Sequence, residues 1–280
     1  MAYASYPDTL VTASATAHTK GVYAQIVAST PFASSRIYVQ ARWASLGSRT
    51  FLFDIATGAS GSEVVLISNI LMYPDFESLA SGGIIAFDVN IPIGTRLSVR
   101  CQNSTTVNPN IHIAVMLEDR ALASIPNPVT YGANTGITHG TSVDPGIATN
   151  TKGVYIQITP STTDNISALA IYSTLQNVGD IISSFTTWKL DIAIGASGSE
   201  VIVIPDIPLT ANSQADSVRI SAVRYPIIIP AGTRIAVRCE CSSNSATFRA
   251  LSVILIGMQE PVPAILTSRE AIQFSVVKPE

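Results

Sequence analysis

The sequence predicts an all-β chain made of two tandem antiparallel β-sandwiches, of jelly-roll or immunoglobulin-like topology, that arose by internal duplication. Two observations support this prediction. A stretch at residues 54–65 (DIATGASGSEVV) returns almost unchanged at residues 191–202 (DIAIGASGSEVI). Apolar and polar residues also alternate with a period of two through much of the chain, which is typical of half-buried strands.

Repeated segments define the domain boundaries. TKGVYAQI at 19–26 matches TKGVYIQI at 151–158, and PIGTR at 92–96 matches PAGTR at 230–234. The spacing between matching positions grows along the chain, so we expect insertions mainly around residues 175–180, in a surface loop. We expect a lead at 1–8, a first sandwich at 9–119, a linker at 120–139, a second sandwich at 140–258 and a C-terminal docking tail at 259–280.

The alternation predicts about seven strands in each unit. Leu97, Val99 and Cys101 alternate with polar neighbours, and Trp188, Leu190 and Ile192 do the same in the second unit. Turn signals separate the strands, for example GG at 82–83, NPN at 108–110 and PAG at 230–232. We find no amphipathic helix longer than a turn or two.

Composition limits the classes of function. Hydrophobic residues make up 47% of the chain, charged residues only 12%, and the mean hydropathy is +0.36. No apolar run approaches the roughly 20 residues of a membrane-spanning helix, so we expect no membrane partner. A net charge of −3 argues against nucleic acid. We interpret the low fraction of charged residues as a sign that other subunits cover apolar surface, and we expect a homo-oligomer.

No recognisable motif for catalysis, metal or cofactor binding is present, so we predict no catalytic, cofactor-binding or metal-ligating residues. Buried small apolar residues are the expected role of the cysteines rather than metal or redox chemistry. Spacing alone leaves a zinc site or a Ser-His-Asp triad open for the histidines, but no nucleophile-elbow motif accompanies them, so we do not favour either site. These residues are Cys101, Cys239 and Cys241, and His18, His112 and His139.

Charged residues repeat at matching positions in the two units. Asp54 and Asp191 lie on the polar side of their predicted strands, and basic residues accompany each of them. Two close carboxylates would indicate glycoside hydrolysis, but each unit supplies one aspartate here and Glu63 lies across a turn from it. We therefore predict a repeated structural ion pair or a subunit contact. The matching basic pairs are Lys20 with Lys152, Arg96 with Arg234, and Arg100 with Arg238.

The repeated glycine-rich turn superficially resembles a phosphate loop. It lacks the Gly-Lys-Ser/Thr ending, and a strand rather than a helix follows it, so no helix N-terminus is available for phosphate. We expect its two glycines to supply positive φ in a tight connection.

Aromatic residues offer an alternative binding surface. Tyr23 and Tyr155 are predicted to point outward and, with Trp43 and Trp188, could form a platform on which a sugar stacks. Trp188 follows the core-facing register of its strand, and Trp43 has no counterpart in the second unit. Core or interface packing is therefore the favoured interpretation for these residues.

The TKGVY, DIxxGASGSEV and IPxGTRxxVR patterns resemble a family of repeated β-rich virion proteins of tailed bacteriophages, of the decoration or tail-associated type. The resemblance covers residues 9–119 and 141–258. It implies a structural protein with no catalytic residues to carry over. It also implies location on the virion after assembly in the host bacterial cytoplasm, where unpaired cysteines persist.

From these observations we expect a non-enzymatic virion structural protein, and within that class a capsid decoration or cement protein that bridges shell subunits. Its partners would be the major capsid protein or other virion proteins. The alternative is a tail-associated adhesin that binds a receptor or carbohydrate, with a host surface glycan as partner. A carbohydrate hydrolase is a third hypothesis, for which the sequence supplies no pair of carboxylates.

Overall fold

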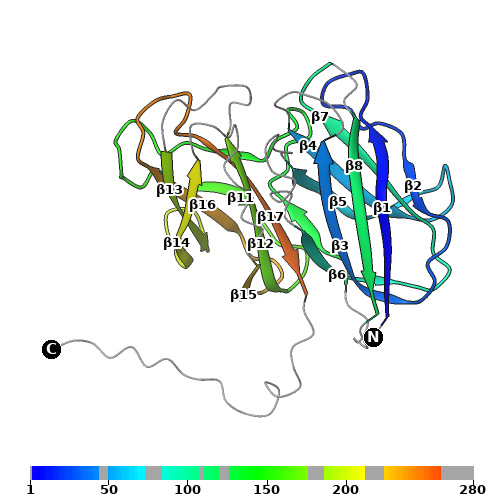
Figure 1. Cartoon of the computed structure of the whole chain (residues 1–280). Coiled ribbons are helices and arrows are strands. Elements are labelled where there is room, and N and C mark those ends of the chain that lie inside the picture. Colours follow the sequence, from blue (N-terminus) through cyan, green and yellow to red (C-terminus); the bar gives the residue numbers. More distant parts are fainter. Residues whose placement is uncertain are drawn as a thin grey trace, which may run out of the picture.

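The computed structural model describes residues 2–43, 50–72, 84–106, 110–119, 126–175, 186–211 and 224–259. These residues form seventeen strands and no helix, and every strand pairing in the sheets is antiparallel (Figure 1). The predicted all-β, antiparallel architecture is confirmed. None of the described residues belongs to a helix long and apolar enough to cross a membrane.

The first half of the chain contributes two four-stranded sheets. Their orders are β1-β8-β3-β6 and β2-β7-β4-β5. The strands are β1 (Tyr3–Thr12), β2 (Ala24–Val27), β3 (Ser34–Trp43), β4 (Phe51–Thr57), β5 (Val64–Met72), β6 (Ile85–Ile91), β7 (Leu97–Asn103) and β8 (Asn110–Glu118).

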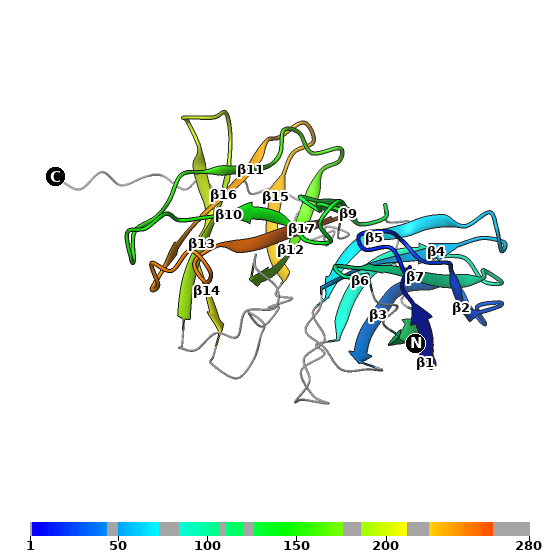
Figure 2. The same cartoon turned by 90° about the horizontal axis from the view of Figure 1, so that it is seen from above.

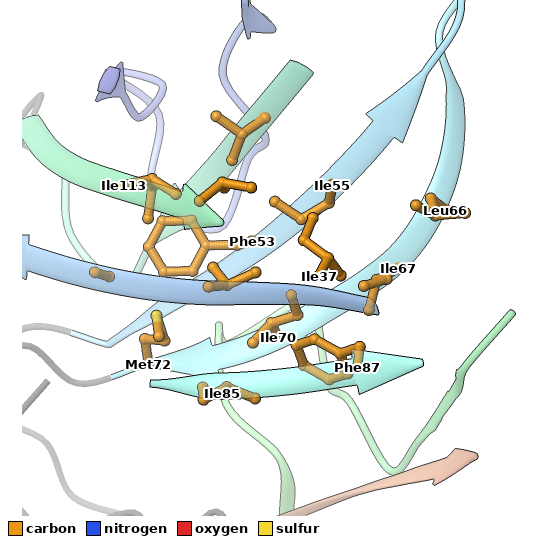
Figure 3. Close-up of a cluster of buried hydrophobic side chains, with 14 of the residues drawn as sticks. Ile37, Phe53, Ile55, Leu66, Ile67, Ile70, Met72, Ile85, Phe87 and Ile113 are labelled. Carbon is orange, nitrogen blue, oxygen red and sulfur yellow. The ribbon is translucent and has the colours of Figure 1, made fainter. Parts of the chain in front are cut away.

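Both sheets of the first half contribute to one hydrophobic core. Ile37 and Phe87 come from the first sheet and Phe53, Ile55 and Ile70 from the second, and Figure 3 shows these side chains gathered between the strands. All five are at most 1% exposed. Burial at about 25 cal/mol per Å² of apolar surface is what holds the two sheets together.

The second half also contributes two sheets. Their orders are β10-β17-β12-β15, with β9 also on β17, and β11-β16-β13-β14. The strands are β9 (Val129–Tyr131), β10 (Thr141–Val143), β11 (Ile156–Thr159), β12 (Ile166–Leu175), β13 (Thr186–Ile194), β14 (Val201–Ala211), β15 (Arg224–Ile229), β16 (Ile235–Cys241) and β17 (Leu251–Met258).

Strand β17 has two short partners where β8 has one long partner. β10 pairs with residues 251–253 and β9 with residues 255–257, whereas β1 runs along β8 from residue 110 to residue 118. Residues 132–140 leave the sheet between β9 and β10. They bind the first half, because Gln102 Nε2 donates to Thr135 O at 2.7 Å and to Thr138 Oγ1 at 2.8 Å.

Strands β12 and β17 are buried on both faces. Leu169 and Leu255 point into the core of the second half, while their neighbours Ala170, Tyr172 and Ile254 belong to the core cluster of the first half. Figure 2 shows β12 and β17 lying between the rest of the second half and strands β5 and β6. The halves are therefore joined by apolar packing, not only by the connecting chain.

Some of the predicted segments contain strands, and others lie outside the described residues. Residues 3–8 of the expected lead belong to β1, and β9 lies within the expected linker. Outside the described residues lie linker residues 120–125, tail residues 260–280, the turns at 82–83 and 108–109, and the insertion at 176–180; the side chain of Trp43 is not described either.

Candidate functional site

The outer face of the β2-β7-β4-β5 sheet carries a buried carboxylate with several donors. Asp54 of β4 lies opposite Arg100 of β7, and its side chain is 4% exposed. Lys20 Nζ donates to Asp54 Oδ1 at 2.8 Å, and Arg100 Nε donates to Oδ2 at 2.9 Å. The backbone N–H of Asn69, which has φ of 51°, donates to Oδ1 at 3.0 Å. Asp54 thus holds the irregular backbone of β5 at Asn69 as well as the side chains of Lys20 and Arg100.

The same arrangement occurs in the second half. Lys152 Nζ donates to Asp191 Oδ1 at 2.8 Å, Arg238 Nε donates to Oδ2 at 3.0 Å, and the Asp206 N–H donates to Oδ1 at 3.0 Å. The predicted repeated ion pair is therefore confirmed. We call these two arrangements the first and second clamp. A carboxylate that already accepts three hydrogen bonds is a structural anchor rather than a proton-transfer group.

One substitution makes the clamps electrostatically different. Asp206 occupies the position of Asn69, and its Oδ1 lies 2.9 Å from Lys152 Nζ. Burial lowers the pKa of Lys20, against the opposing effect of Asp54. Burial also disfavours charged Lys152, but its hydrogen bonds to Asp191 and Asp206 outweigh burial and raise its pKa. The second clamp therefore holds its lysine charge more firmly.

A tyrosine covers the arginine of each clamp. The guanidinium carbon lies 4.6 Å from the ring centroid both for Arg100 over Tyr23 and for Arg238 over Tyr155. This is within the range of cation–π contact. The preceding Val22 is 82% exposed. The predicted outward direction of the tyrosines is confirmed, and each ring is held at the sheet surface beside an exposed apolar tip.

A second arginine holds the glycine-rich turn of each half. Arg96 donates from Nε to Gln25 Oε1 at 3.0 Å, and from Nη1 to Gly58 O at 3.0 Å and Glu63 Oε1 at 3.1 Å. Gly58 has φ of 102° and Gly61 of 84°, as expected for this turn. Arg234 makes the same three contacts in the second half, to Gln157, Gly195 and Glu200.

Strand register places these groups on one surface in each half. Gln25, Ser98, Ala56 and Val65 lie directly opposite one another across β2, β7, β4 and β5, so their side chains share the outer side. Gln157, Ala236, Ala193 and Ile202 form the matching row. We define the first face as Val22, Tyr23, Gln25, Val65 and Arg96, and the second face as Val154, Tyr155, Gln157, Ile202 and Arg234.

The cysteines and Trp188 have the environments that were predicted. All three thiols are free and at most 1% exposed, and burial raises the pKa of Cys101 and of Cys239 to about 12. Trp188 is 1% exposed and donates from Nε1 to Arg249 O at 2.9 Å. Neither Trp188 nor any cysteine can therefore take part in a surface site.

The histidines are dispersed among structural contacts. His18 Nδ1 lies 2.9 Å from Thr138 Oγ1, and His112 Nδ1 lies 2.7 Å from Asp8 Oδ1. His139 is 6% exposed, and its pKa is lowered to about 4 by burial and by the nearby His18. Among the described residues, no three histidine, cysteine or acidic side chains gather in a way that could hold a metal ion.

Sequence reasoning missed the ionic contact between the halves. Asp88 of β6 is 3% exposed and accepts from Arg36 Nε at 2.6 Å and from Arg224 Nη2 at 2.8 Å. Arg224 lies in the second half, so no comparison of the two repeats brings it beside Asp88. The sequence signals Arg224 only through the difference from Ala86, the uncharged residue at the matching position of the first half.

No protein-family model and no curated protein matches the chain. Among solved structures it is similar to PNGase F, a glycosylasparaginase from Flavobacterium meningosepticum, with 10% identity over 93% of this chain and 97% of PNGase F and a TM-score of 0.42. PNGF-II shows 8% identity over 93% of this chain and 66% of its own length, with a TM-score of 0.43. XepA, a PBSX exported protein, shows 9% identity over 90% of this chain and 86% of its own, with a TM-score of 0.23.

These comparisons correct two predictions made from the sequence. The expected non-enzymatic virion structural protein, with its decoration or cement role, is contradicted because a glycosylasparaginase is among the structures that the chain is similar to. The prediction that the chain is not an enzyme is contradicted for the same reason. Structures this distant transfer no activity or substrate to this chain.

Proposed function

We propose that this chain is a carbohydrate-binding protein with one glycan site in each half, formed by the first and second faces. The observation that carries the proposal is that the same tyrosine, glutamine and arginine are held by the same contacts twice. A clamp alone would stabilise each half without a half-exposed tyrosine ring or an exposed glutamine beside it. The repetition thus extends to groups that face solvent.

The chemistry of these faces suits a sugar. A ring face such as that of Tyr23 packs against the apolar C–H side of a pyranose, while Gln25 offers both donors and an acceptor to hydroxyl groups. Arg96 and Arg100 are held in fixed directions by Glu63 and Asp54, so little side-chain entropy is lost when they donate to a ligand. Exposed Val65 extends the apolar part of the surface.

Two sites in one chain favour a ligand with repeating units. Once one site has bound a glycan that can span both sites, the effective concentration of that glycan at the other site is in the millimolar range. Packing of β12 and β17 against the first half supports a fixed distance between the faces.

Three further expectations accompany this proposal. The pairs of sheets are two tandem sandwiches produced by duplication, supported by the matching contacts and registers of the halves. The chain is located on a phage particle after assembly in the bacterial cytoplasm, where it contacts other virion proteins or the major capsid protein; the sequence resemblance alone supports this. The low charged fraction supports a homo-oligomer.

The test is a glycan array followed by calorimetric titration of the best binder. Tyr23→Ala and Tyr155→Ala should each remove one site, and the double variant should lose binding. Tyr3→Ala is the matched control, because Tyr3 is 55% exposed on a different sheet, and it should bind like the wild type. Failure of every glycan to bind the wild type, or full binding by the double variant, would overturn the proposal.

The same samples also report whether the chain cleaves its ligand. Chromatography of the glycan after incubation shows shortened or released products if it does. Products that depend on neither tyrosine would place the chemistry away from the two faces.

A further inference from the structure

The contact between the halves joins two different kinds of surface. The first half contributes its β5–β6 side, through the Arg224–Asp88 ion pair and a hydrogen bond from Thr130 Oγ1 of β9 to Ser68 O of β5. The second half contributes the outer face of β12 and β17 (Figure 2). Because the two surfaces differ, this contact leaves one surface of each kind unoccupied. These are the outer face of β3 and β8 in the first half and the β14–β15 edge in the second half.

Register identifies the matching positions on the interface face. Tyr38 pairs with Met116 and Gln40 with Ala114 in the first half, as Ala170 pairs with Ile256 and Tyr172 with Ile254 in the second. The outermost pair is Arg36 with Glu118 in the first half and Ala168 with Met258 in the second.

The interface face is apolar in the second half and polar in the first. Tyr172, Ile254 and Met258 are at most 1% exposed and pack in the first half's core cluster. Gln40 and Glu118 occupy the positions of Tyr172 and Met258. Arg36 occupies the position of Ala168 and binds Asp88. Glu118 is 3% exposed and already accepts from the Tyr38 hydroxyl, whereas half-buried Arg36 and Gln40 would lose their remaining water if a partner covered this face.

The β5–β6 side has diverged in the opposite direction. Asn69 and Asp206 match because each donates its backbone N–H to a clamp carboxylate. Buried Leu71 and half-buried Ser68 therefore correspond to exposed Pro208 and Pro205 on β14.

Strand β15 shows the same change. Asp88 pairs with Arg36 as Pro226 pairs with Ala168, so exposed Pro226 takes the place of the buried interface aspartate. Prolines are confined to sheet edges and discourage pairing there, because they lack an N–H.

We propose that the outer face of β1-β8-β3-β6 and the β14–β15 edge are a complementary pair of surfaces whose fitting partner is a second copy of this chain. Head-to-tail growth through them is blocked by Arg36 and Gln40 on the face and by the three prolines on the edge. The contact between the two halves of one chain therefore forms, but further copies cannot add through the same two kinds of surface. Any homo-oligomer of the native chain then uses other surfaces.

Two complementary variants test this proposal. The face variant carries Arg36→Ala, Gln40→Tyr, Glu118→Met and Ala86→Arg, which copies the second half's interface including the position of Arg224. The edge variant carries Pro205→Ser, Pro208→Leu and Pro226→Asp, which copies the first half's side. Each has only one competent surface, so neither should polymerise alone. Light scattering should show equimolar complexes in the mixture that are heavier than either variant alone.

A matched control isolates the designed ion pair. An edge variant with Pro226→Arg in place of Pro226→Asp should form no complex with the face variant, because two arginines would meet. Circular dichroism and thermal unfolding of each variant establish that it is folded; if the face variant is not, the version that retains Glu118 replaces it. A folded pair that stays at the mass of its components at about 100 µM, well above the micromolar Kd expected of a modest interface, overturns the proposal.

Discussion

Replacing Ile256 by alanine removes three carbons from the contact between the halves. Ile256 is 0% exposed on the side of β17 that belongs to the first half's core cluster. At about 0.8 kcal/mol per buried methylene, the transfer free energy alone is about 2.4 kcal/mol. The cavity that remains brings the expected loss in the free energy of unfolding to about 3–4 kcal/mol, within the range of about 2–5 kcal/mol for such changes.

The matching residue in the first half supplies the control. Met116 has the same place in the register of β8 but is half-exposed on the uncovered face, so Met116→Ala should cost less than about 1 kcal/mol. Guanidinium denaturation monitored by tryptophan fluorescence measures both variants, with equal m-values required for the comparison. Equal losses for the two variants would refute the inference that the halves bury β17 between them.

Three other perturbations test the clamps and buried groups. Asp54→Asn should cost about 3 kcal/mol in denaturation, because two partly buried cations lose their anion, and Asp191→Asn should behave alike. His139 has a folded pKa of about 4, below its unfolded value of about 6.5, so its contribution to stability is complete above pH 6.5 and is lost as pH falls toward 4. Stability should therefore fall by about 2 kcal/mol between pH 7 and pH 5 on its account, and His139→Gln should show a correspondingly smaller slope. Cys101, like the other two thiols, should resist a maleimide reagent at pH 8 until denaturant is added, and rapid labelling of the native chain would contradict its burial.

The two halves illustrate how a duplicated chain can keep one surface and change another. The donor–acceptor distances of the clamp and turn contacts agree between the two copies to within about 0.1 Å. Both sets of contacts have the same role, which is to hold β5 or β14. The surfaces at the internal contact differ in polarity because only one copy of each is covered. Burial thus accounts for the divergence at Gln40 and Tyr172.

The amino-acid pattern was enough to predict the antiparallel β class, the repeat, the outward tyrosines, the buried cysteines and the pairing of Asp54 and Asp191 with basic residues. These features depend on alternation and on matching positions inside one repeat, so a pattern of period two is enough to place them. The glycines of the turn at residue 58 are likewise specified locally, because positive φ favours glycine.

Which sheet faces are covered, and by which residues, depends on how the two halves pack and could not be predicted from the pattern. Alternation shows that Ile254 and Ile256 share a side of β17, but it cannot show that the first half covers that side, because the covering residues lie more than 150 positions away. The long apolar run of β17 therefore had no explanation in the sequence. The Arg224–Asp88 pair was hidden for the same reason: its two charges come from different repeats and meet only when the halves pack.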